Sequence, residues 1–335
     1  MGRKLKITVL VDESTVTIED PQFELPHDKT DTEYHVVEAL RDIGYKVSVV
    51  GAINDVGSLV EKLTENKSDL VFNLTEEFNG DRRLDQGIAG LLELLGLPYT
   101  GSGPAALMLC RDKRLCKELL NLHKIRVPGF LSITAGKTAH VPKNINWPLV
   151  VKPAFEDSSE GISNASVVYD IDALNNRAKF VHERWNQAAI AEEYIDGREF
   201  YVTVLGNKQL NVLPIRECSF EASEEGGPLM ATYRVKWDAE FREKWKIRFG
   251  FAELDNKTFK DINRICKKVY RALHLRDYGR IDLRLTASNK IVVLEANPNP
   301  DLAYGEEVAE AAEKAGIGYN EFIDRIVHNA LRRYR

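Results

Sequence analysis

The sequence predicts an α/β protein made of three consecutive pieces, the last of which has α+β character. Apolar, strand-like runs alternate with helical segments in the first third, a short strand-and-loop region follows, and the last third combines long helices with a hairpin. The chain has 335 residues, of which 44% are hydrophobic, so it can bury more than one core. We predict the domain boundaries 1–108, 109–190 and 191–335.

The first piece is typical of an open parallel sheet. The runs 5–11 and 46–50 are apolar, and the segment 30–43 between them has apolar residues at helical spacing, which predicts a βαβ unit. We expect a further buried strand at 69–74, a helix at 88–95 and a short strand at 97–100. Ligands of such sheets bind at the carboxyl ends of the strands.

The second piece begins with a predicted helix at 111–123 that carries Lys113. A strand at 149–151 then leads to Lys152 and the small, polar loop AFEDSSEGIS. A loop of this kind can close over phosphate groups, with Ser158 and Ser159 as donors and Lys152 as a point charge. A plain surface turn and a solvated lysine are the alternatives at these positions.

The third piece opens with an apolar strand that ends at Glu192 and Glu193, followed by a turn and Glu199. A carboxylate at a strand end can accept hydrogen bonds from an adenine amino group or a ribose hydroxyl, although solvated acids beside a turn are the commoner case. Helices are expected at 259–273, 306–315 and 319–331.

Two strand-like runs near the C-terminus, GRIDLRL and IVVLEANPNP, predict a hairpin whose polar turn is 286–290. Asp282 and Glu295 then face each other, with Arg280 and Asn297 beside them. Two carboxylates and an amide oxygen are ligands that Mg²⁺ takes when it also holds phosphates, and an arginine can meet phosphate oxygens with a bidentate fork. An edge hairpin with solvated charges is the alternative.

Composition excludes several other classes of protein. The net charge of −5 comes from mixed acids and bases without a basic stripe, so nucleic acid is not expected as a partner. No apolar run is long enough for a membrane helix, and the first residues lack a signal-peptide pattern, so we expect a cytoplasmic protein that does not bind membranes. The four cysteines form neither a CxxC pair nor a zinc-ligand cluster.

Taken in order along the chain, these motifs resemble the ATP-grasp superfamily. Within it, residues 69–331 look most like the D-alanine–D-alanine ligase group, because of the stretch PYTGSG, the Asp112-Lys113 pair and the loop VKPAFEDSSEGIS. The resemblance implies a three-domain ATP-grasp fold with an N-terminal Rossmann-like preATP-grasp domain. ATP would then lie between the last two domains.

The resemblance also implies roles for individual residues. Arg280, Ser158 and Lys236 would act at the reacting centre, and Asp282, Glu295 and Asn297 would hold two Mg²⁺ ions, with Mn²⁺ as the alternative metal. The implied ATP contacts are Lys113, Lys152, Glu156, Ser159, Glu192, Glu193, Tyr194, Ile195, Glu199 and Lys236.

The implied reaction joins a carboxylate to an amine. ATP converts the carboxylate to an acyl phosphate, the amine attacks it, and ADP and phosphate leave, which requires little side-chain base chemistry. We expect amino acids or a small peptide as substrates, and the resemblance implies a homodimer.

Several departures from the family pattern fall where substrates would bind. The first strand runs into VDESTVTIED, Thr75-Glu76 replaces a His-Gly pair, and Asp157 replaces a glycine. Trp237 replaces a tyrosine, and PNPDLAYGEE replaces a Pro-Gly and serine segment that holds the second substrate's carboxylate. We therefore predict a substrate other than two D-alanines.

Three alternatives remain open at this point. The chain could be a divergent D-alanine–D-alanine ligase, a ligase for a larger or non-amino-acid amine, or a nucleotide-binding regulatory protein without turnover.

Overall fold

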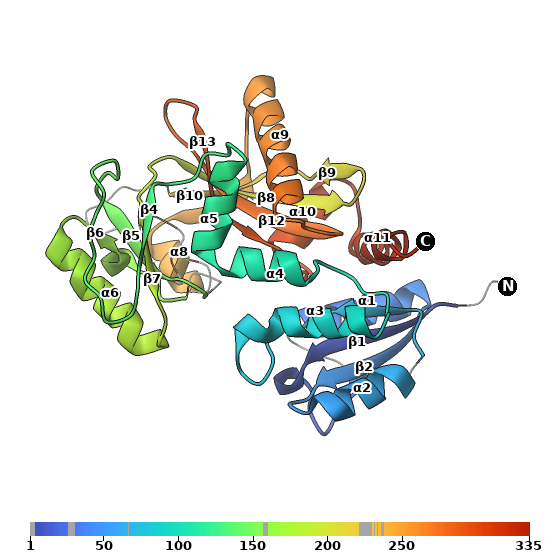
Figure 1. Ribbon diagram of the computed structural model, residues 1–335. Coiled ribbons are helices and arrows are strands. Elements are labelled where there is room, and N and C mark those ends of the chain that lie inside the picture. The colour runs from blue at the N-terminus through green and yellow to red at the C-terminus, as the bar shows by residue number, and fades with distance from the viewer. Residues whose placement is uncertain are drawn as a thin grey trace.

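The computed structural model describes residues 4–25, 31–65, 67–156, 160–220, 230, 232, 234–235 and 238–335. Its strands form three sheets with helices packed on them (Figure 1). The predicted mixture of α/β and α+β structure is confirmed. Ser158, Ser159, Lys236 and Trp237, which carry sequence-based predictions, lie outside the described residues.

The N-terminal sheet is parallel and has the order β2-β1-β3, as the βαβ pattern predicted. Its elements and the helices near it are β1 (Lys6–Asp12), α1 (Thr32–Ile43), β2 (Lys46–Ala52), α2 (Val56–Glu65), β3 (Leu70–Asn73) and α3 (Asp85–Leu94). The short strand expected at 97–100 is reduced to a bridge between Val71 and Tyr99. Single-turn 3-10 helices occupy Glu13–Thr15 and Arg82–Leu84.

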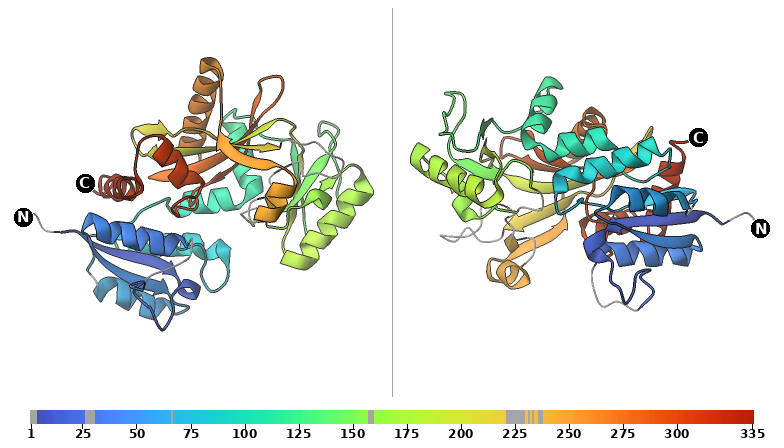
Figure 2. Two further views of the ribbon diagram at one scale, coloured as in Figure 1. Left: turned by 180° about the vertical axis from the view of Figure 1, so that it is seen from behind. Right: turned by 60° about the horizontal axis from the view of Figure 1, so that its bottom comes forward.

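The two faces of this sheet are covered from different parts of the chain. Residues of α2 and α3 pack on one face with Leu10, Val50 and Val71. The other face packs against α1 and against α11 (Tyr319–Leu331), which contributes Phe322 and Ile326 to the same core. The N-terminal sheet and the C-terminal helix therefore share a core, and both chain ends lie at the same end of the molecule (Figure 2).

The helix predicted at 111–123 is confirmed as α5 (Lys113–Leu122), but α4 (Pro104–Arg111), which was not predicted, lies directly before it. Asp112, between the two helices, has extended backbone angles. The Asp112 carboxylate accepts hydrogen bonds from the backbone N–H groups of Arg114 and Leu115, so it caps the second helix. The first helix begins with Pro104, whose fixed φ suits that position.

The middle of the chain forms a four-stranded sheet of order β4-β7-β5-β6, with a single-turn 3-10 helix at Asn164–Ser166. Its elements are β4 (Phe130–Ile133), β5 (Leu149–Pro153), β6 (Val167–Val168), α6 (Ile171–Trp185) and β7 (Ala189–Glu193). The boundary predicted at residue 190 falls inside β7, which pairs with β4 and β5. We therefore propose that this piece extends to Glu193.

The C-terminal piece is built on a six-stranded sheet of order β11-β10-β8-β12-β13, with β9 paired to β8. Its elements are β8 (Arg198–Gly206), β9 (Leu210–Val212), β10 (Arg216–Phe220), α8 (Ala239–Lys244), β11 (Ile247–Phe251), α9 (Asn256–Ala272), β12 (Tyr278–Leu285), β13 (Ile291–Asn297) and α10 (Glu307–Lys314). The predicted hairpin is confirmed, because β12 and β13 are antiparallel with Asp282 opposite Glu295 and Arg280 opposite Asn297.

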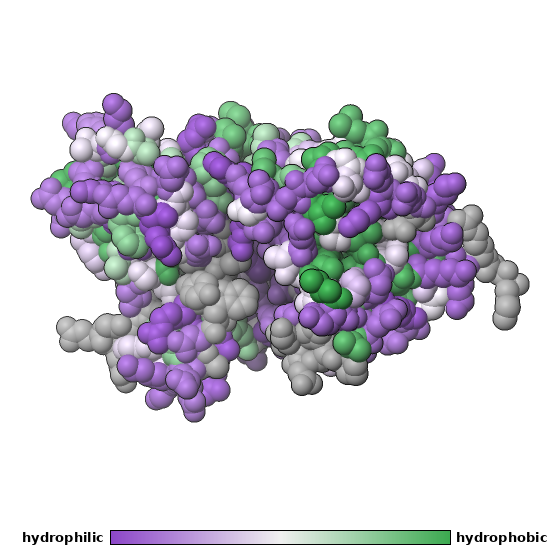
Figure 3. Space-filling view, turned by 90° about the horizontal axis from the view of Figure 1, so that it is seen from below, coloured by the Kyte–Doolittle hydropathy of each residue, from purple (hydrophilic) through white to green (hydrophobic). Residues whose placement is uncertain are grey.

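No helix in the described part of the chain is long and apolar enough to cross a membrane. On the face seen in Figure 3, hydrophilic residues prevail and hydrophobic ones occur in small groups.

Candidate functional site

One face of the six-stranded sheet carries most of its charged groups. Successive side chains of a strand point to opposite faces, so Arg280, Asp282 and Arg284 lie on one side of β12 while Ile281 and Leu283 lie on the other. The apolar side packs against α9 in a buried core. The charged side continues onto β8, where the register places Glu199 beside Arg284 and Tyr201 beside Asp282.

The residues predicted to contact ATP line one small cavity. It lies where β5 and β7 of the four-stranded sheet meet β8, β12 and β13. The predicted residues in its wall are Lys113, Lys152, Glu156, Glu192, Glu193, Tyr194, Ile195, Glu199, Asp282 and Glu295. Its volume is about 70 Å³, below the roughly 300–1,000 Å³ of common ligand pockets, so a nucleotide could enter only if the walls moved apart.

Glu192 is the centre of a buried charge cluster in this cavity. Its carboxylate lies 3.2 Å from Lys152 Nζ and 3.1 Å from Lys117 Nζ. Burial alone would raise the pKa of Glu192, but the two lysines outweigh it and the pKa is lowered. Burial likewise opposes the charge of Lys152, yet the attraction of Glu192 and Glu295 raises its pKa. Lys152 is therefore held in its charged form beside this carboxylate.

Lys113 and Lys117 lie one helical turn apart at the start of α5 and connect this helix to two other segments. Lys113 Nζ donates to the backbone carbonyl of Glu156, and Lys117 Nζ donates to that of Leu294 on β13. The Glu156 side chain accepts a hydrogen bond from Gln187 Nε2 at 2.7 Å, which fixes the end of the described part of the loop.

Glu199, the predicted ribose contact, is held by a residue that the motif analysis did not single out. Arg284 donates to Glu199 Oε2 through Nη2 at 2.6 Å and Nε at 3.1 Å, and Tyr201 donates to Oε1 at 2.9 Å. The turn before β8 requires a glycine, because Gly197 has φ +146° and a Cβ there would lie 2.2 Å from the Leu285 carbonyl oxygen.

The last residue of β7 holds neighbouring segments of the chain together. The Glu193 carboxylate accepts from the backbone N–H of Gly129 at 3.0 Å and from the N–H and side chain of Asn146, both at 2.7 Å. This side chain therefore ties three segments of the small sheet together. The Ile195 carbonyl accepts from Arg284 Nη1, so the chain between β7 and β8 is anchored on β12.

The predicted metal ligands lie next to one another on the hairpin. Asp282 is clamped by Arg280, whose Nε and Nη2 donate to the two carboxylate oxygens at 2.8 and 3.0 Å, and Asn297 Oδ1 accepts from the backbone N–H of Asn299. No group of three or more His, Cys, Asp or Glu side chains suited to a metal occurs among the described residues. Two carboxylates and one amide still fit Mg²⁺ when phosphate oxygens complete the coordination.

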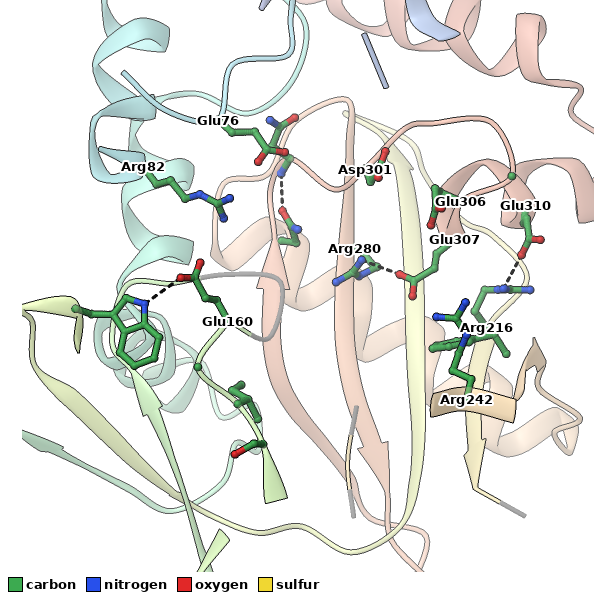
Figure 4. Close-up of a pocket in the computed structure, with 18 of the residues that line it drawn as sticks. Glu76, Arg82, Glu160, Arg216, Arg242, Arg280, Asp301, Glu306, Glu307 and Glu310 are labelled. Atoms are coloured by element: carbon green, nitrogen blue, oxygen red, sulfur yellow. Dashed lines mark hydrogen bonds and ion pairs between the residues drawn. The ribbon is translucent and has the colours of Figure 1, made fainter. Parts of the chain in front are cut away.

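Arg280 connects this hairpin to a second, much larger cavity. Its Nη1 donates to Glu307 Oε2 at 2.7 Å, and its guanidinium lies 5.4 Å from the ring centroid of Tyr201. Burial opposes its charge, but Asp282 and Glu307 raise its pKa well above the ordinary value. The large cavity has a volume of about 1,100 Å³ and is bordered by Arg280, Asn297, Glu76, Arg82 and the segment 301–310 (Figure 4).

The sequence analysis missed three residues with a clear place in this arrangement: Lys117, Arg284 and Glu307. The sequence spacing could have indicated two of them. Lys117 follows Lys113 by one helical turn, and Arg284 follows Asp282 by the two-residue period of a strand. Glu307 is distant from Arg280 in sequence, and only the folded chain brings the two together.

Comparisons with known proteins agree with this geometry. The profile of a family described as "D-ala D-ala ligase C-terminus" matches residues 120–328. A D-alanine–D-alanine ligase of Bordetella petrii is 34% identical over 249 residues, which are 73% of this chain and 72% of that protein. An uncharacterised protein of Sinorhizobium fredii is 33% identical over 304 residues, covering 89% of this chain and 87% of the relative.

Solved structures with the same fold cover nearly the whole chain. The D-alanine–D-alanine ligase of Bacillus anthracis, in complex with ATP, has a TM-score of 0.75 at 24% identity and covers 98% of each chain. The VanG D-Ala:D-Ser ligase of Enterococcus faecalis has a TM-score of 0.70 at 20% identity and covers 98% of this chain and 100% of that one.

Proposed function

Since this chain belongs to the D-alanine–D-alanine ligase family of ATP-grasp proteins, we propose that it is an ATP-dependent ligase that joins a carboxylate to an amine and releases ADP and phosphate. The expected ATP-grasp fold is confirmed. The observation that carries the proposal is the charged face of β8, β12 and β13, which places the metal-type ligands and Arg280 between the small and the large cavity.

ATP is proposed to occupy the small cavity after its walls open. The relative solved with ATP supports this assignment, as does Lys152, whose charge can neutralise phosphates. The backbone from Glu193 to Ile195 would line the adenine, and Glu199 would accept from the ribose. Because Arg284 and Tyr201 already orient Glu199, its carboxylate is positioned before any ligand arrives.

Asp282, Glu295 and Asn297 are proposed to hold two Mg²⁺ ions, for which Mn²⁺ is the alternative. When bound, these ions would neutralise the charge of the transferring phosphoryl group. The register of the hairpin supports the assignment, because it puts the two carboxylates opposite each other.

Arg280 is proposed to stabilise negative charge at the reacting carbonyl. Its guanidinium is buried, and its planar fork is oriented by Asp282 and Glu307. A donor that is fixed before the reaction, in a site shielded from water, stabilises a developing oxyanion without reorganisation. The same shielding would protect an acyl phosphate from hydrolysis.

Substrates are proposed to be amino acids or a small peptide, bound in the large cavity. Three residues where the sequence departs from the family pattern, Glu76, Asp301 and Glu306, line this cavity, which supports a substrate other than two D-alanines. We further propose that the protein is a cytoplasmic homodimer. Analytical ultracentrifugation would measure its mass in solution.

The test is ADP release with Mg-ATP and a panel of D- and L-amino acids, singly and in pairs, with mass spectrometry of the products. A pair that accelerates turnover and yields a product lighter than its components by one water supports the ligase. Acceleration by paired D-alanines alone would identify a divergent D-alanine–D-alanine ligase. ATP binding without acceleration by any pair would favour a regulatory protein and contradict our proposal.

A further inference from the structure

Two acidic groups on one wall of the large cavity have no ion pair with the residues that the structure describes. In Figure 4, Asp301, Glu306, Glu307 and Glu310 line one wall, which comes from the segment that follows the hairpin. Glu307 and Glu310 are paired with Arg280 and Arg216. Asp301 accepts hydrogen bonds from the Thr32 hydroxyl and the Ala303 N–H, both of them neutral donors.

Glu306 has no ion pair and no side-chain hydrogen bond with the residues that the structure describes, although it is half-buried. Burial raises the pKa of its carboxyl group, and repulsion by Asp301, Glu307 and Glu310 raises it further, while the attraction of Arg242 offsets only part of this shift. A carboxylate in this position is stabilised by any cation that enters the cavity.

Arg216 supplies the opposite charge. It is only 8% exposed and lines the same cavity, where its guanidinium pairs with Glu310 and lies over the ring of Phe251. A buried guanidinium at the cavity wall can form charge-assisted hydrogen bonds with an anionic group of a ligand. Arg242 lies beside it in the cavity wall (Figure 4).

We propose that the amine substrate of this ligase is a basic amino acid, with its cationic side chain at Asp301 and Glu306 and its carboxylate at Arg216 and Arg242. The inference rests on the proposed ligase function and specifies its substrate. The cavity extends from these four residues to Arg280 and Asn297 in the reacting centre, so the amine of such a substrate has a path to the activated carboxylate.

A neutral amino acid fits this wall less well. It would leave Glu306 unpaired beside three other carboxylates, and closing the site over it would remove water from that carboxylate at a further cost. A cationic side chain removes both penalties. Charge thus provides a stronger basis for discrimination than shape does in a cavity of this size.

The test uses three acceptors that differ in one group at a time. Arginine carries both charges, citrulline replaces the guanidinium by a neutral urea group of similar shape, and agmatine lacks the carboxylate. D and L forms are assayed by ADP release and product mass with the same panel of acid substrates. We expect kcat/KM for arginine to exceed that for citrulline and for agmatine by roughly tenfold or more, as for a lost charged hydrogen bond.

A matched pair of variants tests the assignment of the wall. Glu306→Gln should reduce the arginine-to-citrulline ratio by roughly tenfold, whereas Glu313→Gln, an exposed acid on the same helix, should leave the ratio unchanged. Direct calorimetric titration of the full chain with arginine and with citrulline gives the same comparison without turnover.

The outcomes separate the two proposals. Neutral acceptors that work as well as arginine would overturn the substrate inference and leave the ligase function intact. If no acceptor stimulates turnover, the ligase function fails. The titration then tests the substrate inference by itself. The inference is supported if arginine binds more tightly than citrulline to the unmodified protein but not to the Glu306→Gln variant, and any other result contradicts it.

Discussion

The two cavities treat charge in opposite ways. In the small one, Glu192, Glu199 and Asp282 each meet a cation, and the pKa of Glu192 is lowered in spite of its burial. In the large one, burial and repulsion between carboxylates raise the pKa of Glu306. The first arrangement is complete without a ligand, which suits chemistry that every member of a family performs. The second awaits opposite charge from a substrate, which suits selection among substrates.

The largest difference should come from the hairpin between the cavities. Glu295→Gln removes one of two proposed metal carboxylates, which is worth several kcal/mol, so ATP turnover should fall by at least about 10³-fold. The fold should remain, because the amide keeps the shape of the side chain. Rates of ADP release and thermal unfolding of the variant and of Glu313→Gln provide the measurement. A Glu295→Gln protein that still turns over ATP would contradict the metal assignment.

A second comparison concerns stability. Glu192→Gln removes the carboxylate that pairs with buried Lys117 and Lys152, and breaking a buried pair costs about 3–5 kcal/mol. Glu118→Gln breaks an exposed pair with Arg114 and should cost below about 1 kcal/mol. Denaturant unfolding of both variants measures these two losses of stability. Equal stability of the Glu192→Gln protein and the unmodified one would show that the buried cluster is not balanced as described.

The pH dependence of that effect has a definite sign. Because the pKa of Glu192 is lowered in the folded state, its contribution is present above the ordinary glutamate pKa of about 4.3 and is lost as the pH falls through the folded value.

A smaller pH dependence of stability, with the opposite sign, is expected from an acid beside the large cavity. Asp12, at the end of β1, accepts hydrogen bonds from the backbone N–H groups of Glu76 and Glu77, and burial raises its pKa from 3.8 to about 6. A carboxyl group whose pKa is raised in the folded state favours folding at low pH. That contribution to stability is lost as the pH rises from about 4 to about 6.

Asp12→Asn removes this titration. The stability of the variant relative to the unmodified protein should therefore rise between pH 4 and 6 by about 1–2 kcal/mol, allowing for partial solvent screening, and then stay level. Asp42→Asn, at an exposed site on α1, should show no such step. A difference that is flat across this range would contradict the buried state of Asp12.

The sequence predicted elements well where periodicity was strong. The hairpin and its register followed from alternating apolar residues on both strands, and they brought Asp282 and Glu295 together correctly. The helix α4 was not predicted, and only the capping carboxylate of Asp112 marks in the sequence where α5 begins after it. The contacts of Arg280 with Glu307 and of Glu192 with Lys117 depend on tertiary packing, which local patterns do not encode.

The shared core of β1, β3 and α11 has a consequence for how the chain folds during synthesis. β3 is complete about 250 residues before α11 is made, which at roughly 5–20 residues per second is an interval of about ten to fifty seconds. Throughout that time, part of one apolar face of the N-terminal sheet lacks its final cover. A chaperone that binds exposed apolar surface would find its target there, and release would coincide with the arrival of the C-terminal helix.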